Sequence, residues 1–324
     1  MPLEVQGGDY EHVLDLFADP ASKDKFTYCR TNLAALSKVV LNGDPFDVAE
    51  YSLANHIMLQ ARGERRVAAI PVFPNRALRN VALFAPVDSP LHAPEQLAGK
   101  RVGVGEFAMT TAVWTRGHIQ DACGLDWRSV EWVVRPKPRF PAPPGFRIVQ
   151  SEEDLEEQVC AGKLDAIMTG RPKDHNKPPA QRRLRSLTPA PDLVEREYFE
   201  RTKLFPIMHT VVLHAHVLEQ ETAPKAIFDA YARAKQAALK RRLGATFLPG
   251  AERLWDGAVE LNVDSVRYGL TPLNRRNIET LSRYLLEQKL IENIPPTDSL
   301  FVTGAADWSD DDWPDDKRRT PEHA

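Results

Sequence analysis

Two arginines stand between two apolar runs in the first third of the chain. Arg76 and Arg79 follow the run 66–73 and precede the run 80–84, and both runs have the composition of buried strands. A guanidinium presents a planar set of donors that holds a carboxylate bidentately. The pair therefore predicts a carboxylate clamp in a turn between buried strands, and two exposed surface arginines are the alternative.

A second candidate anion site lies where an expected strand at 101–104 leads into a helix. The connecting loop ends near Thr110 and Thr111, either of which would cap the helix. Free N–H groups at a helix start, together with the helix dipole, attract anions. An ordinary capped helix would use the same residues, so both interpretations stay open.

A third group of polar residues closes the expected strand 164–168. Thr169, Gly170 and Arg171 follow it directly. Open α/β sheets present their ligand loops at such strand ends. We expect these residues to face the same ligand as the arginine pair.

The acid–base candidates are one histidine and three carboxylates. His209 lies on a strand-like run at 205–216, and the titration range of histidine suits proton transfer near neutral pH. Asp47 and Glu50 belong to the expected strand 46–51, and Glu106 lies in the loop before the helix. Each carboxyl group is either a proton donor or a charge near a helix start.

A metal site is a weaker alternative. His214 and His216 form a His-x-His pair, which in a strand would point both imidazoles to one side. Such a pair is half of a metal site, but no third ligand stands nearby in the sequence. A divalent metal at this pair therefore stays a minor alternative.

The composition excludes several classes of protein. The chain has 324 residues, of which 43% are hydrophobic and 27% charged, and its formal net charge is -3. A near-neutral chain shows no excess of positive charge that would bind nucleic acid or an anionic membrane. No apolar run in the sequence is long enough to span a bilayer. Three scattered cysteines read as reduced thiols, and the N-terminus lacks a secretory signal. We expect a cytoplasmic protein.

Strands alternate with helices along the chain, which favours an α/β protein with parallel sheets. The clearest expected helices cover 32–41, 53–61, 225–243 and 274–290, with Ser52 as the cap of the second. The chain leaves one α/β unit near residue 90 and returns near 200. This order predicts two lobes joined by two crossing strands with a ligand cleft between them, lobe I from 1–90 and 205–324 and lobe II from 91–204.

Three local expectations concern the chain after residue 150. Ser151 to Asp154 has the pattern of a capping box that opens a helix. Residues 173–190 are polar and basic and are expected to form a loop. The stretch from about residue 305 carries acidic and then basic residues and is expected to be a surface tail.

Several segments have a distinctive composition: Gly8-Asp-Tyr10, Phe46-Asp-Val-Ala-Glu-Tyr-Ser52, Ala69-Ile-Pro-Val-Phe-Pro-Asn-Arg76, Leu97-Ala-Gly-Lys-Arg-Val-Gly-Val104, Met109-Thr-Thr-Ala-Val-Trp-Thr-Arg-Gly117, Pro206-Ile-Met-His209 and Leu273-Asn-Arg-Arg-Asn-Ile-Glu279. Together with Arg79 they resemble the 4,5-dihydroxyphthalate decarboxylase family, a branch of the type II periplasmic-binding-protein fold. The chain departs from that family at Leu78, where an aromatic residue is usual, and in longer basic loops at 135–147 and 172–185.

The resemblance implies loss of carbon dioxide from a hydroxylated aromatic dicarboxylate without an organic cofactor. For that reaction we expect His209 to be the partner of a ring hydroxyl and Glu50 or Glu106 to be the proton donor, because all three fall on expected hinge strands or strand-end loops. The expected substrate-binding residues are Phe73, Arg76, Arg79, Met109, Thr110, Thr111, Thr169, Gly170 and Arg171.

Other functions remain open at this point. Most relatives of this fold are solute receptors, so a binding or ligand-sensing protein for a small aromatic or pyrimidine-like acid is the main alternative. We expect a small aromatic carboxylate as the partner and a homo-oligomer as the assembly, with neither nucleic acid nor membrane bound.

Overall fold

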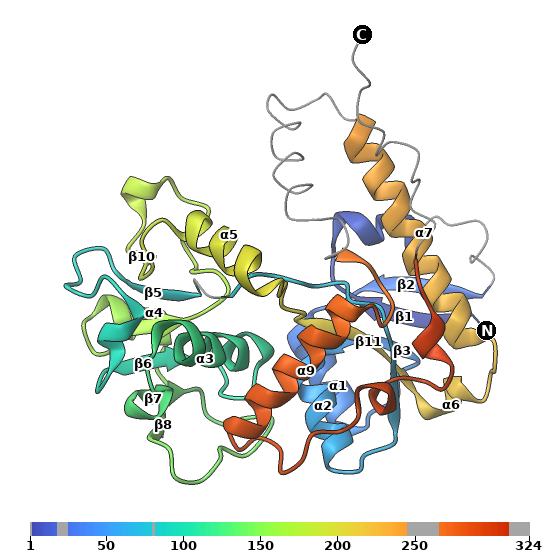
Figure 1. The fold of residues 1–324 in the computed structure, drawn as a ribbon, viewed down its shortest axis with the longest axis horizontal. Coiled ribbons are helices and arrows are strands. Elements are labelled where there is room, and N and C mark those ends of the chain that lie inside the picture. Colours follow the sequence, from blue (N-terminus) through green and yellow to red (C-terminus); the bar gives the residue numbers. More distant parts are fainter. Residues whose placement is uncertain (1, 18–24, 80–81, 245–265, 311–324) are drawn as a thin grey trace.

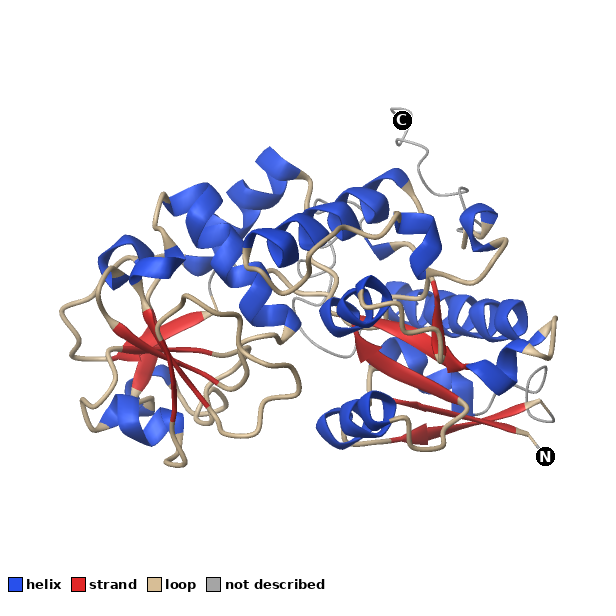
Figure 2. Cartoon of the chain, turned by 90° about the horizontal axis from the view of Figure 1, so that it is seen from below, coloured by secondary structure: helices blue, strands red, loops and turns tan. Residues whose placement is uncertain are grey.

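Two β-sheets lie at opposite ends of the long axis of the molecule, and helices cover and connect them (Figures 1 and 2). The computed structural model describes residues 2–17, 25–79, 82–244 and 266–310. No helix among these residues is long and apolar enough to cross a membrane.

The first sheet has five strands in the order β2-β1-β3-β11-β4. β1 pairs in parallel with β2 and β3, whereas the late strand β11 inserts antiparallel between β3 and β4. The strands are β1 Leu3–Gly7, β2 Phe26–Arg30, β3 Val48–Ser52, β4 Val67–Ile70 and β11 His209–His214. The return of β11 places His209 beside strands that come from the first seventy residues.

The second sheet has six strands in the order β10-β5-β9-β6-β7-β8. Strands β9, β6, β7 and β8 are parallel, and β5 pairs antiparallel with both β9 and β10 near the other edge. The strands are β5 Leu83–Pro86, β6 Arg101–Val104, β7 Glu131–Val134, β8 Ile148–Gln150, β9 Ala166–Met168 and β10 Leu184–Ser186.

The chain also forms α-helices and short 3₁₀ helices, which cover and connect the two sheets. The α-helices are α1 Leu33–Asn42, α2 Leu53–Ala61, α3 Thr110–Cys123, α4 Leu155–Cys160, α5 Pro191–Thr202, α6 Ala215–Leu218, α7 Ala223–Gly244 and α9 Pro272–Glu287. The 3₁₀ helices are η1 Glu11–Phe17, η2 Pro94–Leu97, η3 Trp127–Ser129, η4 Pro179–Gln181, η6 Thr297–Leu300 and η7 Ala305–Asp307.

Local capping explains where the early helices begin and end. Asn32 caps α1 by accepting from two backbone N–H groups, and Gly43 ends it with φ of 75°. Ser52 accepts from the N–H of Asn55 and caps α2. The predicted helices 32–41 and 53–61 are therefore confirmed, together with the role of Ser52.

Two predicted caps are wrong. The N-cap of α3 is Met109, so Thr110 is already the first helical residue and Thr111 the second. The N-cap of α4 is Asp154, because its carboxylate accepts from the N–H groups of Glu156 and Glu157. Ser151 instead accepts a hydrogen bond from the side chain of Gln158. The pattern placed a capping residue in the correct segment each time but at the wrong position.

Three segment predictions also need correction. The stretch 173–190 is not all loop, since β10 adds there to the edge of the second sheet. His216 lies in α6 rather than on a strand with His214. The stretch after 305 is not simply a surface tail, because Asp310 is buried and pairs with Lys235 of α7. Residues 311–324 lie outside the described part of the chain.

Two chain segments cross between the sheets and lie next to each other. Arg76 and Ile207 form an isolated antiparallel bridge, and the carbonyl of Asn75 accepts from the N–H of Met208 at 2.9 Å. We call residues 71–79 and 205–209 the hinge segments. The predicted boundary at residue 90 assigns β5 to lobe I, whereas β5 pairs with β9 and β10 of the second sheet. The first crossing therefore ends before Leu83.

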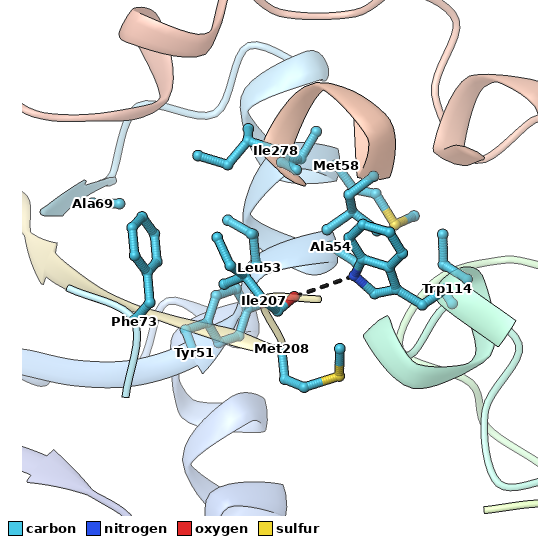
Figure 3. Packing of buried hydrophobic residues seen from close by; sticks show 14 of the residues in the cluster. Tyr51, Leu53, Ala54, Met58, Ala69, Phe73, Trp114, Ile207, Met208 and Ile278 are labelled. Atoms are coloured by element: carbon cyan, nitrogen blue, oxygen red, sulfur yellow. Dashed lines mark hydrogen bonds between the residues drawn. The ribbon is translucent and has the colours of Figure 1, made fainter. Parts of the chain in front are cut away.

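The hydrophobic core continues through the hinge. Trp114 of α3 donates from its indole N–H to the carbonyl of Ile207 at 3.3 Å and packs near Met58 of α2 and Ile278 of α9 (Figure 3). Truncation of a fully buried tryptophan costs roughly 3–5 kcal/mol. This packing ties α3, at the start of which several predicted site residues lie, to the hinge.

Candidate functional site

A buried carboxylate on β3 is the centre of the site. Glu50 is 2% exposed and faces the returning strand β11. Its Oε2 accepts from the N–H of Gly8 at 2.8 Å, and its Oε1 accepts from the Tyr10 hydroxyl at 2.8 Å. The Nδ1 atom of His209 lies 2.5 Å from the same Oε1. Three donors from two distant parts of the chain, residues 8–10 and His209, thus surround one carboxylate.

These contacts determine the charge of Glu50. Burial by itself would raise its pKa, but the hydrogen bond and charge of His209, the Gly8 N–H and the Tyr10 hydroxyl together hold the pKa below its usual value. Glu50 is therefore a carboxylate at neutral pH. A carboxylate at this position orients the imidazole and favours the tautomer that carries its proton on Nδ1.

His209 keeps its other ring nitrogen available. The side chain is 22% exposed, and Nε2 makes no hydrogen bond to any described residue. Its backbone N–H donates to the carbonyl of Asn75 in the facing hinge segment. The histidine is thus fixed at Nδ1 and open at Nε2, the arrangement of an acid–base group.

Aromatic hydroxyls that the sequence interpretation missed complete this centre. Tyr10 receives a hydrogen bond from the side-chain amide of Asn75 at 2.9 Å and stacks on His12. Tyr28 donates to the carbonyl of Gly8 at 2.8 Å. Burial, followed by the nearby charge of Glu50, raises the pKa of both tyrosines well above the usual value. The phenols therefore stay protonated and act as donors. The segment Gly8-Asp-Tyr10 pointed to Tyr10, whereas no sequence signal pointed to Tyr28.

Arg76 faces the interior of the first lobe. Its Nη2 donates to the carbonyl of Arg267 at 3.0 Å and to the Oδ1 of Asn274 at 2.7 Å, and the guanidinium lies over the ring of Phe73. Burial lowers the pKa of Arg76 to about 10, against the raising effect of Tyr268 and Asp310. Its Nε and Nη1 atoms are shielded from solvent and have no partner among the described residues. Arg76 thus anchors the hinge to α9 and retains unused donors.

Arg79 lies in a different environment, against the second lobe. A Cβ built on Gly170 would be 3.1 Å from Nη1 of Arg79, so the guanidinium lies directly on the Gly170 backbone. Burial, and then the like charge of Arg171, lowers its pKa, whereas Glu195 acts in the opposite direction. The hydroxyl of Thr169 donates to the carbonyl of Arg171. The fold therefore brings Arg79 next to the residues that follow β9. The guanidinium groups of Arg79 and Arg76 lie in different lobes.

The start of α3 joins the two lobes. The hydroxyls of Thr110 and Ser52 are 2.7 Å apart, and the Thr111 hydroxyl donates to the sulfur of Met208 at 3.7 Å. Ser52 faces His209 in the β3–β11 ladder. Thr110 is buried, so its hydroxyl makes a contact between lobes, whereas Met109 and Thr111 are partly exposed.

Glu106 is paired with a residue of the loop 135–147. Its carboxylate pairs with the guanidinium of Arg139, and Oε1 accepts from the Arg139 N–H at 3.1 Å. Both side chains are largely buried, at 14% and 21% exposure. Glu106 makes no described contact with His209 or Glu50, so it belongs to the loop that follows β6 and not to the group around Glu50.

His214 and His216 contact each other without forming a three-ligand group. Their Nδ1 atoms are 2.7 Å apart, and Nε2 of His216 lies 2.8 Å from the Asp47 carboxylate. Within the described ranges, no cluster of three or more His, Cys, Asp or Glu residues has a metal-binding arrangement. Asp47 also accepts from the N–H of Glu4, so its carboxylate is engaged by neighbouring segments and lies apart from Glu50.

Sequence comparison identifies relatives of the chain. It is 30% identical over 210 residues to a 4,5-dihydroxyphthalate decarboxylase of Comamonas testosteroni, in an alignment that covers 60% of this chain and 62% of that protein. The chain is similar to 4,5-dihydroxyphthalate decarboxylases. A second such protein, from Pseudomonas putida, is 29% identical over 136 residues, or 39% of this chain and 53% of the relative. The match therefore spans less than two thirds of either relative. No family model matches the chain.

Solved structures identify the fold. The aliphatic sulphonate binding protein SsuA of Escherichia coli superposes with a TM-score of 0.54 at 13% identity, over 91% of this chain and 90% of that one. A Candida albicans protein described as having the generic periplasmic binding protein fold gives a TM-score of 0.52 at 14% identity, over 91% and 92%. The chain thus has the two-lobed periplasmic-binding-protein fold, as the decarboxylase resemblance implied.

Proposed function

We propose that the protein is a decarboxylase of a hydroxylated aromatic dicarboxylate such as 4,5-dihydroxyphthalate, with 3,4-dihydroxybenzoate as the product. The observation that carries this proposal is the Glu50–His209 pair at the hinge, with Nε2 of the histidine open. The similarity to two 4,5-dihydroxyphthalate decarboxylases supports the same reaction class.

The reaction requires a proton to be added and a carbon–carbon bond to be broken. A proton adds to the ring carbon that carries the departing carboxylate, while the hydroxyl para to it loses its proton and passes electrons into the ring. The electron pair of the breaking bond then returns to the ring as carbon dioxide leaves, and the hydroxyl regains a proton. One proton is consumed for each carbon dioxide released.

We assign His209 to the ring hydroxyl and Glu50 to the orientation of His209. A histidine with its proton on Nδ1 presents a basic Nε2, which can accept the hydroxyl proton and return it. The sequence suggested Glu50 as a proton donor, but its lowered pKa favours the carboxylate. The side chains of Glu106 and Arg139 form an ion pair. Glu106 can therefore donate a proton to the substrate ring only after this ion pair opens.

Arg79 and Arg171 are our candidates for holding the substrate carboxylates. Arg171 follows β9 with Thr169 and Gly170, and the guanidinium of Arg79 lies on the Gly170 backbone. Burial, and then the like charge of Arg171, lowers the pKa of Arg79. An anion between two guanidinium groups would relieve that repulsion. Arg76 would act indirectly, by holding the hinge segment against α9, because its guanidinium faces the interior of the first lobe.

The experiment is turnover of 4,5-dihydroxyphthalate by purified protein, with and without a chelator, followed by chromatography of 3,4-dihydroxybenzoate. We expect product from the native protein, none above background from His209→Asn, and native rates from the exposed control His92→Asn. Chelator-insensitive turnover supports catalysis without a metal. Equal turnover by His209→Asn would exclude the histidine from the chemistry.

A solute-binding or ligand-sensing protein is the second candidate, because the structural neighbours are solute-binding proteins. In that case 4,5-dihydroxyphthalate would raise the thermal midpoint of unfolding without forming product. The same samples therefore distinguish the two functions.

A further inference from the structure

Arg116 of α3 carries a positive charge in the interior of the protein. Its side chain is fully buried, and the guanidinium lies 3.8 Å from the centre of the Phe107 ring and 5.5 Å from that of Trp132. Burial lowers the pKa of Arg116 to about 9, so the group keeps its proton at neutral pH. Moving a charge from water into such an aromatic environment is costly unless an opposite charge compensates it.

The hydrogen-bond partners of this charge are neutral. Nε donates to the side-chain oxygen of Gln288 at 2.9 Å, and Nη2 donates to the carbonyl of Phe107 at 2.5 Å. Nη1 is shielded from solvent and has no partner among the described residues. Within the described part of the chain no carboxylate pairs with Arg116, whereas the buried Lys235 pairs with Asp310. No described group therefore neutralises the charge of Arg116.

The guanidinium lies close to the start of α3. Phe107, whose carbonyl it binds, precedes the first helical residue, Thr110, by three positions. Arg116 follows Thr110 by six positions, or roughly 9 Å along the axis at about 1.5 Å per residue, and long helical side chains point toward the N-terminus. The charge of Arg116 thus adds to the positive end of the helix dipole.

The first turn of α3 has unused donors. The N-cap residue Met109 makes no side-chain cap, and no described acceptor takes up the N–H groups of Thr110 and Thr111. Thr111 is partly exposed, so an anion could reach this turn. Glu106 in the preceding loop is already paired with Arg139. An anion at the helix start would therefore meet a positive field to which Arg116 contributes.

This helix start borders the proposed reaction centre. The hydroxyl of Thr110 lies 2.7 Å from that of Ser52, which faces His209 in the β3–β11 ladder. Thr111 contacts Met208, the residue before His209. An acid whose ring hydroxyl reaches Nε2 of His209 would therefore lie next to the start of α3.

We propose that Arg116 makes the start of α3 selective for a doubly charged acid over a singly charged one. Its guanidinium touches no ligand and acts through its electrostatic field on the first turn of α3. The inference rests on the proposed function, in which a dicarboxylate with two negative charges loses carbon dioxide, takes up a proton and becomes a monocarboxylate with one. The buried charge would therefore hold the substrate more tightly than the product.

The first test measures the field without a ligand. Thr111→Cys places a thiol at the helix start, and alkylation by iodoacetamide at a series of pH values, followed by peptide mass spectrometry, gives the pKa of that thiol. Adding Gln288→Glu puts a carboxylate beside Arg116. The thiol pKa should then rise by about 0.5–1 pH unit, the Coulomb effect of one charge at roughly 10 Å with an effective dielectric constant of about 20–40.

Matched variants separate charge from packing in the same assay. Gln288→Met removes the hydrogen bonds of this side chain without adding a charge, so the thiol pKa should stay unchanged. Arg116→Met should raise the thiol pKa as Gln288→Glu does, whereas Arg116→Lys keeps the charge and should not. The native Cys29 of β2 serves as the internal standard, and its alkylation should be the same in all variants.

The second test compares a dianion with a monoanion. Calorimetric titration of the whole protein with phthalate and benzoate avoids turnover, because neither acid has the ring hydroxyl that the proposed chemistry requires. Gln288→Glu should weaken phthalate binding about three- to tenfold more than benzoate binding, since the effect on affinity grows with the charge of the ligand. Gln288→Met should change both affinities by the same factor.

The inference is overturned if Gln288→Glu and Gln288→Met give the same thiol pKa. It is also overturned if Gln288→Glu weakens both acids equally, or if native protein binds phthalate no more tightly than benzoate. Failure of the proposed function gives a different result, because native protein would then form no 3,4-dihydroxybenzoate while the thiol pKa still responded to Gln288→Glu.

Discussion

Replacement of Glu50 by glutamine tests the central geometry most directly. The carboxylate faces three donor groups, from Gly8, Tyr10 and His209, inside a buried site. A glutamine has only one oxygen, and its NH₂ group would face at least one of these donors. The variant therefore loses at least one charge-assisted hydrogen bond and leaves one donor poorly matched, which costs about 2–4 kcal/mol of unfolding free energy.

The effect on activity follows from the histidine. When the amide donates to Nδ1, the ring proton moves to Nε2, and Nε2 can no longer accept the hydroxyl proton of the substrate. Loss of a positioned acid–base group costs about 10²–10⁴-fold in rate. We expect Glu50→Gln to lower kcat by such a factor while the KM changes much less.

The pH dependence gives an independent check. Because the folded protein lowers the pKa of Glu50 from 4.5, the stability that this group contributes is present above pH 4.5. It is lost as the pH falls through the lower folded-state pKa. Chemical denaturation of native protein and Glu50→Gln between pH 3 and pH 7 should show their difference shrinking toward acid. A variant with native kcat and a pH-independent stability difference would refute the assigned role.

Further predictions concern the two lobes. Gly170→Ala places a Cβ 3.1 Å from Nη1 of Arg79 and should raise the KM several-fold with little change in the unfolding midpoint; an unchanged KM would separate Arg79 from the substrate. Thr110→Val removes the hydroxyl that meets Ser52 and should cost about 1 kcal/mol in denaturant unfolding, an effect that should become smaller in a Ser52→Ala background, where only the hydrogen bond from the Ala54 N–H is left to lose. Glu195 has a pKa raised to about 7 by burial and by Asp192, so its neutral form stabilises the fold at low pH and this contribution is lost as the pH rises from 4.5 through about 7. Glu195→Gln should therefore be relatively more stable than native protein at pH 8 than at pH 4, and an equal difference at both would contradict the shift.

Much of the architecture could be predicted from local sequence. Asn32, Ser52 and Gly43 mark helix ends through contacts within a few residues, and the apolar runs indicate buried strands. The start of α4 is ambiguous in the sequence, because Ser151 and Asp154 both suit a helix cap. The strand β10 could not be predicted, since its pairing with β5 depends on a partner about a hundred residues earlier.

For the candidate site residues, too, local sequence predicts the position along the chain but not the contacts. Local sequence was sufficient to place Arg76, Arg79 and His209 at strand ends or in turns, because apolar runs on either side are a local signal. What these side chains contact depends on the folded chain. Arg76 and Arg79 are three residues apart, yet their guanidinium groups face different lobes. Glu50 is ionised because residues 8, 10 and 209 converge on it, and a pKa depends on neighbours in space rather than along the chain.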